Sequence, residues 1–547
     1  MTSQNNDGPA GLRSLPRRQL IFTLAGMLLA MFLAALDQTV VGTAMPRIIT
    51  DLGGFTHYTW VTTAYLIAST VVVPVAGKLT DLYGRKLLYT IGIIIFMAGS
   101  LLSGLSQTMT QIIIFRGLQG MGAGVIMANT FTVVADLFPP AERGKYQGLM
   151  SGVFGIASVV GPTLGGFITD AFSWHWVFFI NIPLGLLLVV LFVFFFPSLR
   201  PDMGQRRIDY AGVVALTLAT VPAMLALSWG GTEFPWRSPQ ILGMFTLSLV
   251  MAVLFVINEK RSQEPLLPLS LFTNRITGIA VSVQFLAAFG MFGALTFIPL
   301  FFQGVLGLSA TASGSFLTPM QLGMVGGSLI FGQFLSRAGG HYRVQGLIGL
   351  SMMTLGMLLL HTMTIETSFL RAVSYIVLIG FGLGATMPLY VIVVQNAVPH
   401  RMLGAATSAT TFFRAIGASF GLAILGSVMS NRFAAEFMAN LPSTVKSLVP
   451  ADQLSSLVHN PQALVSVQAQ VQLQSLFVQL GPQGTAYYSN VLQSLRHALA
   501  SSITDVFLFG VMVGVLALAL HAFIKEVPLR KGHPSEERPG ATLSRQK

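Results

Sequence analysis

The sequence predicts an all-α polytopic membrane protein, because its composition, its long apolar runs and the placement of its basic residues all favour that class. Hydrophobic residues make up 53% of the 547 positions and charged residues only 9%, and the mean hydropathy is +0.72. Soluble domains carry roughly a quarter charged residues, so a soluble enzyme is excluded. The sequence has no cysteine, which excludes disulfide bonds, thiolate metal ligands and a cysteine nucleophile.

Apolar windows long enough to cross a bilayer as helices, which takes about 20 residues each, recur along the whole chain. The runs are continuous, whereas strands of a membrane barrel would alternate and last about ten residues, so we expect helices. Fourteen spans are expected, separated by short polar or Gly/Pro breaks, at 19–42, 58–77, 87–106, 109–135, 146–169, 177–197, 209–229, 239–258, 276–302, 310–335, 344–363, 370–397, 404–430 and 501–524.

The first of these spans follows three arginines and superficially resembles a secretory signal. We expect it to be retained, because it is long, runs directly into Asp37 without a small-residue cleavage site, and precedes many further spans.

The lysines and arginines predict how the chain is oriented. With a cytoplasmic amino terminus, that side of the membrane holds 23 of the 31 basic residues, the outer side holds 6, and two lie inside spans. The positive-inside rule then predicts a multi-pass protein of the cell (plasma) membrane with both termini in the cytoplasm. The formal net charge of +12 is therefore interpreted as an orientation signal and not as a nucleic-acid-binding surface.

Connections between spans are short, which leaves no room for a separate catalytic domain. The exception is 431–500, a segment rich in Gln and Ser that keeps Leu and Val at near-helical spacing. We expect it to form a helical cap over the outer mouth; docking of a partner or of substrate is the alternative.

The loop between the second and third spans combines glycines, an acid and a basic pair, as Gly77, Asp81, Gly84, Arg85 and Lys86. Glycine permits a tight turn and close helix approach, and the charged side chains can exchange hydrogen bonds. This ordered string resembles the signature loop of the major facilitator superfamily. The resemblance implies a latch that stabilises one access state of a transporter. Asp136 is expected in a nearby turn, either solvated or paired with this loop.

Further segments carry the same resemblance. Gly161, Pro162, Gly165 and Gly166 in the fifth span match the antiporter signature of the superfamily, and segment 116–124 matches its fourth-span signature. Segments 36–46 and 174–183 resemble the fourteen-helix drug/proton antiporter family of the multidrug efflux type.

The resemblance implies two six-helix bundles around a central path, with two extra helices between them. The expected parts are a cytoplasmic tail at 1–18, a bundle at 19–200, the two additional helices with their linkers at 201–262, a second bundle at 263–524 that includes 431–500, and a cytoplasmic tail at 525–547.

Charged residues inside spans are costly and mark candidate functional sites. Asp37 is expected to take up and release the coupling proton, since burial and a nearby arginine push its proton affinity in opposite directions. Arg116 is its expected partner, a structural arginine being the alternative. Asp505 is interpreted either as a second coupling carboxylate or as a helix-start residue favoured by the helix dipole. For Arg414 no partner is predicted.

Polar side chains within the later spans could contact substrate or bond across helices; they are Gln284, Gln321, Gln395 and Asn396. The histidines show no metal-ligand spacing, so no metal and no cofactor other than the proton is expected.

The resemblance implies a proton-coupled antiporter that exports lipophilic and often cationic drugs by alternating access. We expect it to act as a monomer in contact with membrane lipid. Two alternatives remain open. One is export of a lipid, a peptide or an endogenous metabolite, and the other is a non-transporting sensor on the same fold.

Overall fold

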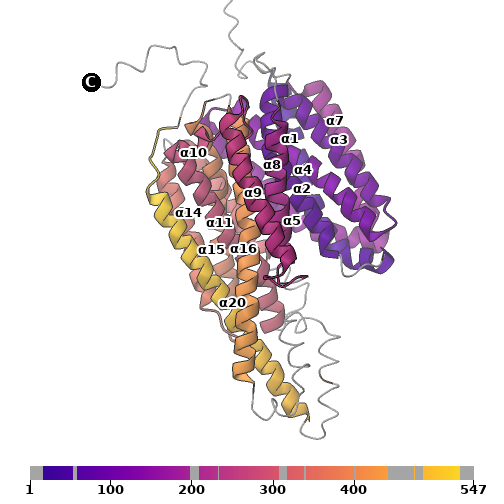
Figure 1. Ribbon diagram of the computed structural model, residues 1–547, viewed down its shortest axis with the longest axis vertical. Coiled ribbons are helices and arrows are strands. Elements are labelled where there is room, and N and C mark those ends of the chain that lie inside the picture. Colours follow the sequence, from indigo (N-terminus) through magenta and orange to yellow (C-terminus); the bar gives the residue numbers. More distant parts are fainter. Residues whose placement is uncertain are drawn as a thin grey trace, which may run out of the picture.

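Helices make up nearly all of the computed structural model, which describes residues 16–52, 58–197, 208–231, 233–306, 317–337, 341–399, 402–441, 474 and 484–529 (Figure 1). The apolar runs fold as helices because a backbone in hydrocarbon must satisfy its own hydrogen bonds. Along these ranges the helices are α1 (Arg17–Leu52), α2 (Tyr58–Tyr83), α3 (Arg85–Gly104), α4 (Met109–Leu137), α5 (Pro140–Ala171), α6 (Trp176–Phe179), α7 (Asn181–Phe195), α8 (Tyr210–Trp229), α9 (Pro239–Arg261), α10 (Ser270–Thr273), α11 (Arg275–Leu300), the π-helical turn η3 (Phe301–Val305), α13 (Leu317–Arg337), α14 (Tyr342–His361), α15 (Phe369–Ala397), α16 (Leu403–Asn440) and α20 (Gly484–Ala522).

Thirteen stretches of helix in the described ranges are long and apolar enough to cross a membrane. They correspond to thirteen of the fourteen expected spans. The remaining one, 310–335, overlaps α13 from Leu317 on, a helix of 21 residues whose four glycines and two glutamines lower its hydropathy. Because α13 packs closely between α5 and α15, small residues suit its position.

The helices form two bundles with an extra pair between them, as the family resemblance implies. In the first bundle α2 and α3 pack on α4, and α1 packs on α5; in the second, α13 and α14 pack on α15, and α11 packs on α16. The extra helices α8 and α9 pack on each other, and α8 also touches α2 and α16. Figure 1 shows α8 and α9 lying between the indigo first bundle and the orange-to-yellow second bundle.

The two bundles meet along α2 with α16 and along α5 with α13. We call the end of the molecule that carries the turn at Gly84 the latch side, and the tightest contacts lie toward it. A Cβ on Gly144 would lie 2.6 Å from the carbonyl oxygen of Gly332, and one on Gly148 would lie 2.7 Å from that of Ser328. Toward the opposite end the helices of the two bundles diverge (Figure 1).

Three helices are much longer than predicted. α1 continues past the expected end at 42 to Leu52. α16 continues past the expected end at 430 to Asn440, and α20 begins at Gly484 instead of 501. Phe433 and Phe437 of α16 pack in the same apolar cluster as Val491 of α20, so the two helices stabilise each other beyond the bundle. The rest of the expected cap lies outside the described residues.

Candidate transport site

Asp37 lies in the middle of α1, and its side chain has no exposed surface. One carboxylate oxygen, Oδ2, accepts a hydrogen bond from Nη1 of Arg116 at 2.6 Å. The other, Oδ1, accepts from Nε2 of Gln119 at 2.8 Å and from Nδ2 of Asn181 at 2.9 Å. Three donors converge on this carboxylate, an arrangement that suits its ionised form.

The cation of the pair comes from α4. Nη1 of Arg116 also donates to Oε1 of Gln119 at 2.8 Å, since residues three apart share a helix face. The guanidinium lies 4.3 Å from the centre of the Tyr65 ring on α2, which adds a cation–π contact. The expected pairing of Asp37 with Arg116 is therefore present.

Asn181 reaches Asp37 because the helix is interrupted there. It is the first residue of α7, directly after the break at Ile180 that separates α7 from α6. Its Nδ2 also donates to Oγ of Ser100 at 2.9 Å. Neither Asn181 nor Gln119 was assigned a role from the sequence. Gln119 could have been found from its spacing to Arg116, but Asn181 is 144 residues from Asp37 and only the fold brings them together.

Protonation of Asp37 would disrupt this arrangement. When the carboxylate binds a proton, one of its oxygens becomes a hydrogen-bond donor instead of an acceptor. Arg116, which is buried, then loses its counter-charge. A buried charge without a partner is strongly unfavourable, so the loss would favour a rearrangement around Arg116. The cluster can thus couple proton binding to helix movement.

The glycines of the fifth-span motif pack α5 against α1 within two helical turns of this carboxylate. A Cβ on Gly161 would overlap the hydroxyl of Thr39, and one on Gly165 would overlap that of Thr43. Only glycine allows this approach of the two helices. Gly166 differs, because no atom lies within 4 Å of the position its Cβ would take.

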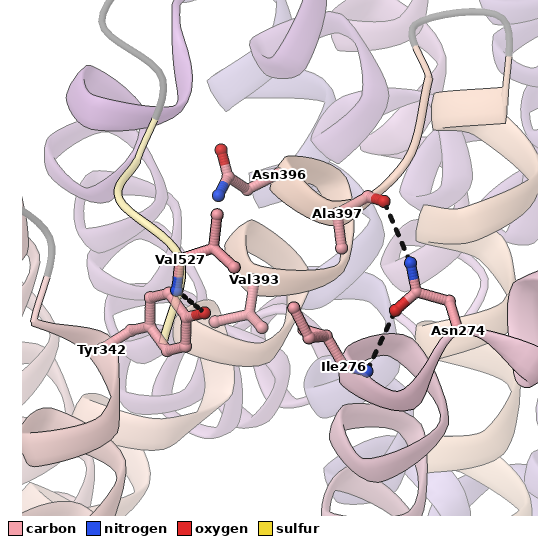
Figure 2. A pocket seen from close by; sticks show the side chains of 7 residues that line it. All are labelled: Asn274, Ile276, Tyr342, Val393, Asn396, Ala397 and Val527. Carbon is pink, nitrogen blue, oxygen red and sulfur yellow. Dashed lines mark hydrogen bonds between the residues drawn. The ribbon is translucent and has the colours of Figure 1, made fainter. Parts of the chain in front are cut away.

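The predicted cavity residues are spread over the second bundle. Asn396 lines a small cavity of about 160 Å³ at the latch-side end, where Oη of Tyr342 accepts from the backbone N–H of Val527 at 2.6 Å (Figure 2). Gln284 of α11 is buried, and Gln321 of α13 is partly exposed. Contact of these three side chains with substrate stays a prediction.

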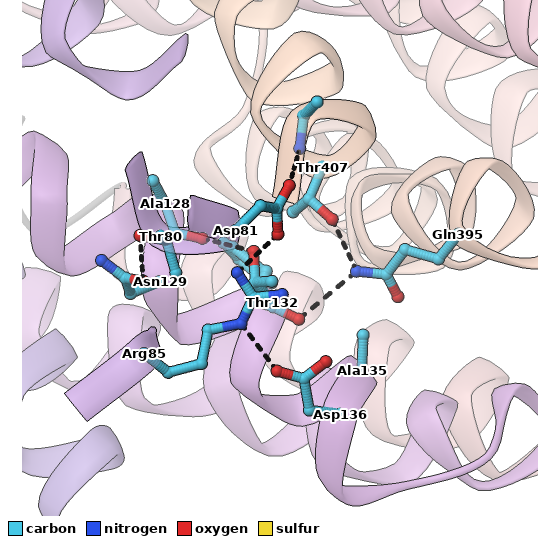
Figure 3. Close-up of polar contacts among 12 residues, drawn as sticks. Thr80, Asp81, Arg85, Ala128, Asn129, Thr132, Ala135, Asp136, Gln395 and Thr407 are labelled. Carbon is cyan, nitrogen blue, oxygen red and sulfur yellow. Dashed lines mark hydrogen bonds and ion pairs between the residues drawn. The ribbon is translucent and has the colours of Figure 1, made fainter. Parts of the chain in front are cut away.

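The latch residues join the two bundles. Arg85 donates from Nη1 to Oδ1 of Asp81 at 2.6 Å and from Nε to Oδ2 of Asp136 at 2.7 Å (Figure 3). Asp81 also accepts, through Oδ2, from the backbone N–H of Ala405 at 3.1 Å. Ala405 lies in the first turn of α16, where the helix dipole favours an anion. Asp136 is 4% exposed, so the solvated alternative for it is wrong and the paired one is confirmed.

The other latch residues contribute differently. Gly84 has φ 93°, a left-handed backbone that glycine tolerates, at the turn between α2 and α3. A Cβ on Gly77 would overlap the side chain of Ser408 on α16, so this glycine is required for contact between the bundles. Lys86 donates to the carbonyl oxygen of Val193 at 2.8 Å and stays within the first bundle.

Gln395 of α15 also bonds across the bundles. Its Nε2 donates to Oγ1 of Thr407 at 2.9 Å and to the carbonyl oxygen of Phe131 at 3.3 Å (Figure 3). Its Oε1 accepts from Nη1 of Arg143 at 3.2 Å. In this conformation Gln395 helps to close the latch side; its predicted contact with substrate stays a prediction.

Asp505 lies apart from the Asp37 cluster. It is well inside α20, not at the start of a helix, so the helix-start interpretation is wrong. Its Oδ2 lies 3.1 Å from Nε of Arg432, an ion pair between α20 and α16 in the second bundle. A role for Asp505 in proton coupling stays a prediction.

Fold and site together define a multi-pass membrane transporter with two helical bundles. A family model described as Major Facilitator Superfamily matches residues 27–422. The chain is 41% identical over 529 residues to the multidrug transporter protein MdtP of Bacillus subtilis, covering 95% of this chain and 96% of that protein. It is 36% identical over 503 residues to multidrug resistance protein 3 of the same species, covering 92% and 94%.

A solved structure shares the fold. The proton:xylose symporter XylE, bound to 6-bromo-6-deoxy-D-glucose, superposes with a TM-score of 0.58 at 14% identity, over 94% of this chain and 98% of that one. The chain belongs to the Major Facilitator Superfamily. Its family and its relatives are transporters and not enzymes.

Proposed function

We propose that this protein is a proton-coupled antiporter that exports lipophilic small molecules, cationic drugs among them, by alternating access. It acts as a monomer in the plasma membrane, in contact with lipid, with both termini and the latch side in the cytoplasm. The proton is its coupling ion, and it needs no other cofactor. The multidrug relatives support the class of cargo, and the placement of basic residues supports the orientation.

The observation that carries the proposal is the sealed Asp37–Arg116 pair. A carboxylate with no exposed surface, held by three donors, can exchange a proton only after the surrounding helices move. Helix movement and proton exchange are thereby linked, as antiport requires.

The latch supplies the second requirement, two access states. With Asp81 bonded to Ala405 and Gln395 bonded to the carbonyl oxygen of Phe131, the cytoplasmic side is closed. Protonation of Asp37 from outside releases the cargo and favours opening of the latch. Loss of that proton to the cytoplasm then permits the next cargo molecule to bind.

The test is transport by the full-length protein in proteoliposomes with an imposed pH gradient and ethidium as cargo. We expect gradient-driven accumulation by the wild type, and loss of at least about 90% of it in Asp37→Asn, because the amide cannot cycle a proton. Normal insertion and monodisperse elution from a sizing column would exclude misfolding as the cause.

Asp51→Asn is the matched control. Asp51 lies in the same helix, half exposed, and accepts a hydrogen bond from Trp174 at 3.0 Å. This variant should transport like the wild type. Full gradient-driven transport by Asp37→Asn would overturn the proposal.

A further inference from the structure

Arg414 stands in the middle of α16, and no acidic side chain of the described residues pairs with it. It lies deep among the helices, yet its side chain is only half-buried, as expected of a group that lines an internal space. In the described ranges its guanidinium makes neither a hydrogen bond nor an ion pair. Charged groups at such depth generally face a substrate or ion path.

The helix geometry shows which way this position faces. Thr407 precedes Arg414 by seven residues, two helical turns, and therefore shares its face of α16. Thr407 accepts from Gln395, whose amide also donates to the first bundle at Phe131, so this face looks between the bundles. Arg414 lies about 10 Å beyond Thr407, away from the closed latch side. The neighbouring Phe412 belongs instead to the cluster with α8 and α9.

The adjacent helix places a second donor at the same level. Gly417 of α16 packs against the backbone of Phe285, and Gly421 packs against that of Phe289. The two contacts are four residues apart in each helix and follow in the same order, so α16 and α11 run parallel. Arg414 lies three residues before Gly417, and Gln284 lies one residue before Phe285, so the two side chains are within one helical turn of the same level. Gln284 is 4% exposed, and its side chain makes no hydrogen bond in the described part of the chain.

Acidic side chains at comparable depth are already engaged within the described residues. Asp37 accepts from three donors, and Asp505 is paired with Arg432. These acidic side chains are therefore not available to Arg414, and a molecule that enters the path between the bundles can supply the anionic group.

We propose that Arg414 binds an acid group of the cargo, so that the substrate class includes lipophilic compounds that carry a carboxylate. The guanidinium matches a carboxylate with two parallel hydrogen bonds, and Gln284 can add a third. The rings of Phe285 and Phe289, which are half-buried, can contact the apolar body. This inference rests on the proposed export function and names a chemical class for it.

The experiment compares two forms of one dye, a rhodamine with a free carboxylate and its methyl ester. Binding to the purified full-length protein in lipid nanodiscs is followed by fluorescence anisotropy. We expect the wild type to bind the acid about tenfold more tightly than the ester, as a charge-assisted bidentate pair allows.

Arg414→Gln should lower the affinity for the acid about tenfold and leave that for the ester unchanged, and Arg414→Lys should restore part of the preference. Arg432→Gln is the control, because this arginine lies in the same helix but is 57% exposed and paired with Asp505. It should keep the wild-type ratio, and a monodisperse Arg414→Gln sample that still binds the ester shows that the fold is intact.

Equal wild-type affinities for the two dyes, an unchanged ratio in Arg414→Gln, or no binding of either dye would overturn the proposal. A clear preference for the acid in nanodiscs without gradient-driven transport of either dye in vesicles would instead refute the export function and leave the assignment of Arg414 standing.

Discussion

At the scale of single residues, the structure explains how a carboxylate can be charged in the middle of a membrane protein. Asp37 has an arginine, a glutamine and an asparagine as donors, from α4 and α7. Each of these hydrogen bonds is one that an ionised carboxylate accepts. The charge is therefore sustained by hydrogen bonds as well as by the ion pair.

Asn181→Ala tests this directly. Removal of one of its three donors weakens the hydrogen-bonded arrangement that holds Asp37. Since a hydrogen bond to a charged group contributes about 1.5 kcal/mol or more, gradient-driven transport of ethidium should fall about tenfold. Initial transport rates in proteoliposomes measure this loss. Asn440→Ala, at an exposed position, should transport like the wild type. A wild-type rate in Asn181→Ala would contradict the donor role.

The sequence predicted the charged members of this site but not its neutral ones. The cost of burying a charge identifies Asp37 and Arg116 from the sequence alone. A neutral asparagine carries no comparable signal. Its role depends on a break between two helices that places it beside a residue far away in the chain.

At the scale of helices, glycine determines where elements touch. The contacts of α2 with α16 and of α5 with α13 need glycine at Gly77, Gly144 and Gly148, because a Cβ would meet a side chain or a carbonyl of the other bundle. These contacts bring the backbones of the two bundles together on the latch side. A bulky residue at one of them should hold the bundles apart there.

Gly144→Val combined with Ser408→Cys makes that expectation measurable. The chain has no native cysteine, and Ser408 is fully buried at the α2–α16 contact. We expect a maleimide to label this cysteine at least about tenfold faster in the Gly144→Val background, because local opening governs access. Gly243→Val is the matched control, since nothing lies within 4 Å of a Cβ there. Equal labelling in both backgrounds would show that the α5–α13 contact does not control the latch.

Hydropathy located the spans well and the ends of the longest helices poorly. Apolar runs must become helices in hydrocarbon, which is why thirteen expected spans recur as helices that are long and apolar enough to cross a membrane, and the remaining one overlaps α13. The ends of α16 and α20 extend beyond the bundle, where polar residues alternate with Phe433, Phe437 and Val491. Only the packing of the two helices on each other, a tertiary effect, stabilises those turns.

At the scale of the whole molecule, two sites in different places must act together. The Asp37 cluster lies within the first bundle, whereas the latch joins Asp81 of the first bundle to the start of α16 in the second. Alternating access links them if proton binding at Asp37 favours one relative position of the bundles. Cargo binding must then change the affinity for the proton, and the reverse must hold with equal strength.

Proton release on cargo binding is the measurement that tests this linkage most directly. Ethidium is added to the detergent-purified protein in weakly buffered solution near the midpoint of its pH titration, and released protons are counted with a pH indicator dye. Because half of the molecules carry the proton at the midpoint, we predict a release approaching about half a proton per bound ethidium from the wild type, and none from Asp37→Asn at equal ethidium occupancy. The same release from Asp37→Asn, or no release from a wild type that binds ethidium, would contradict the account.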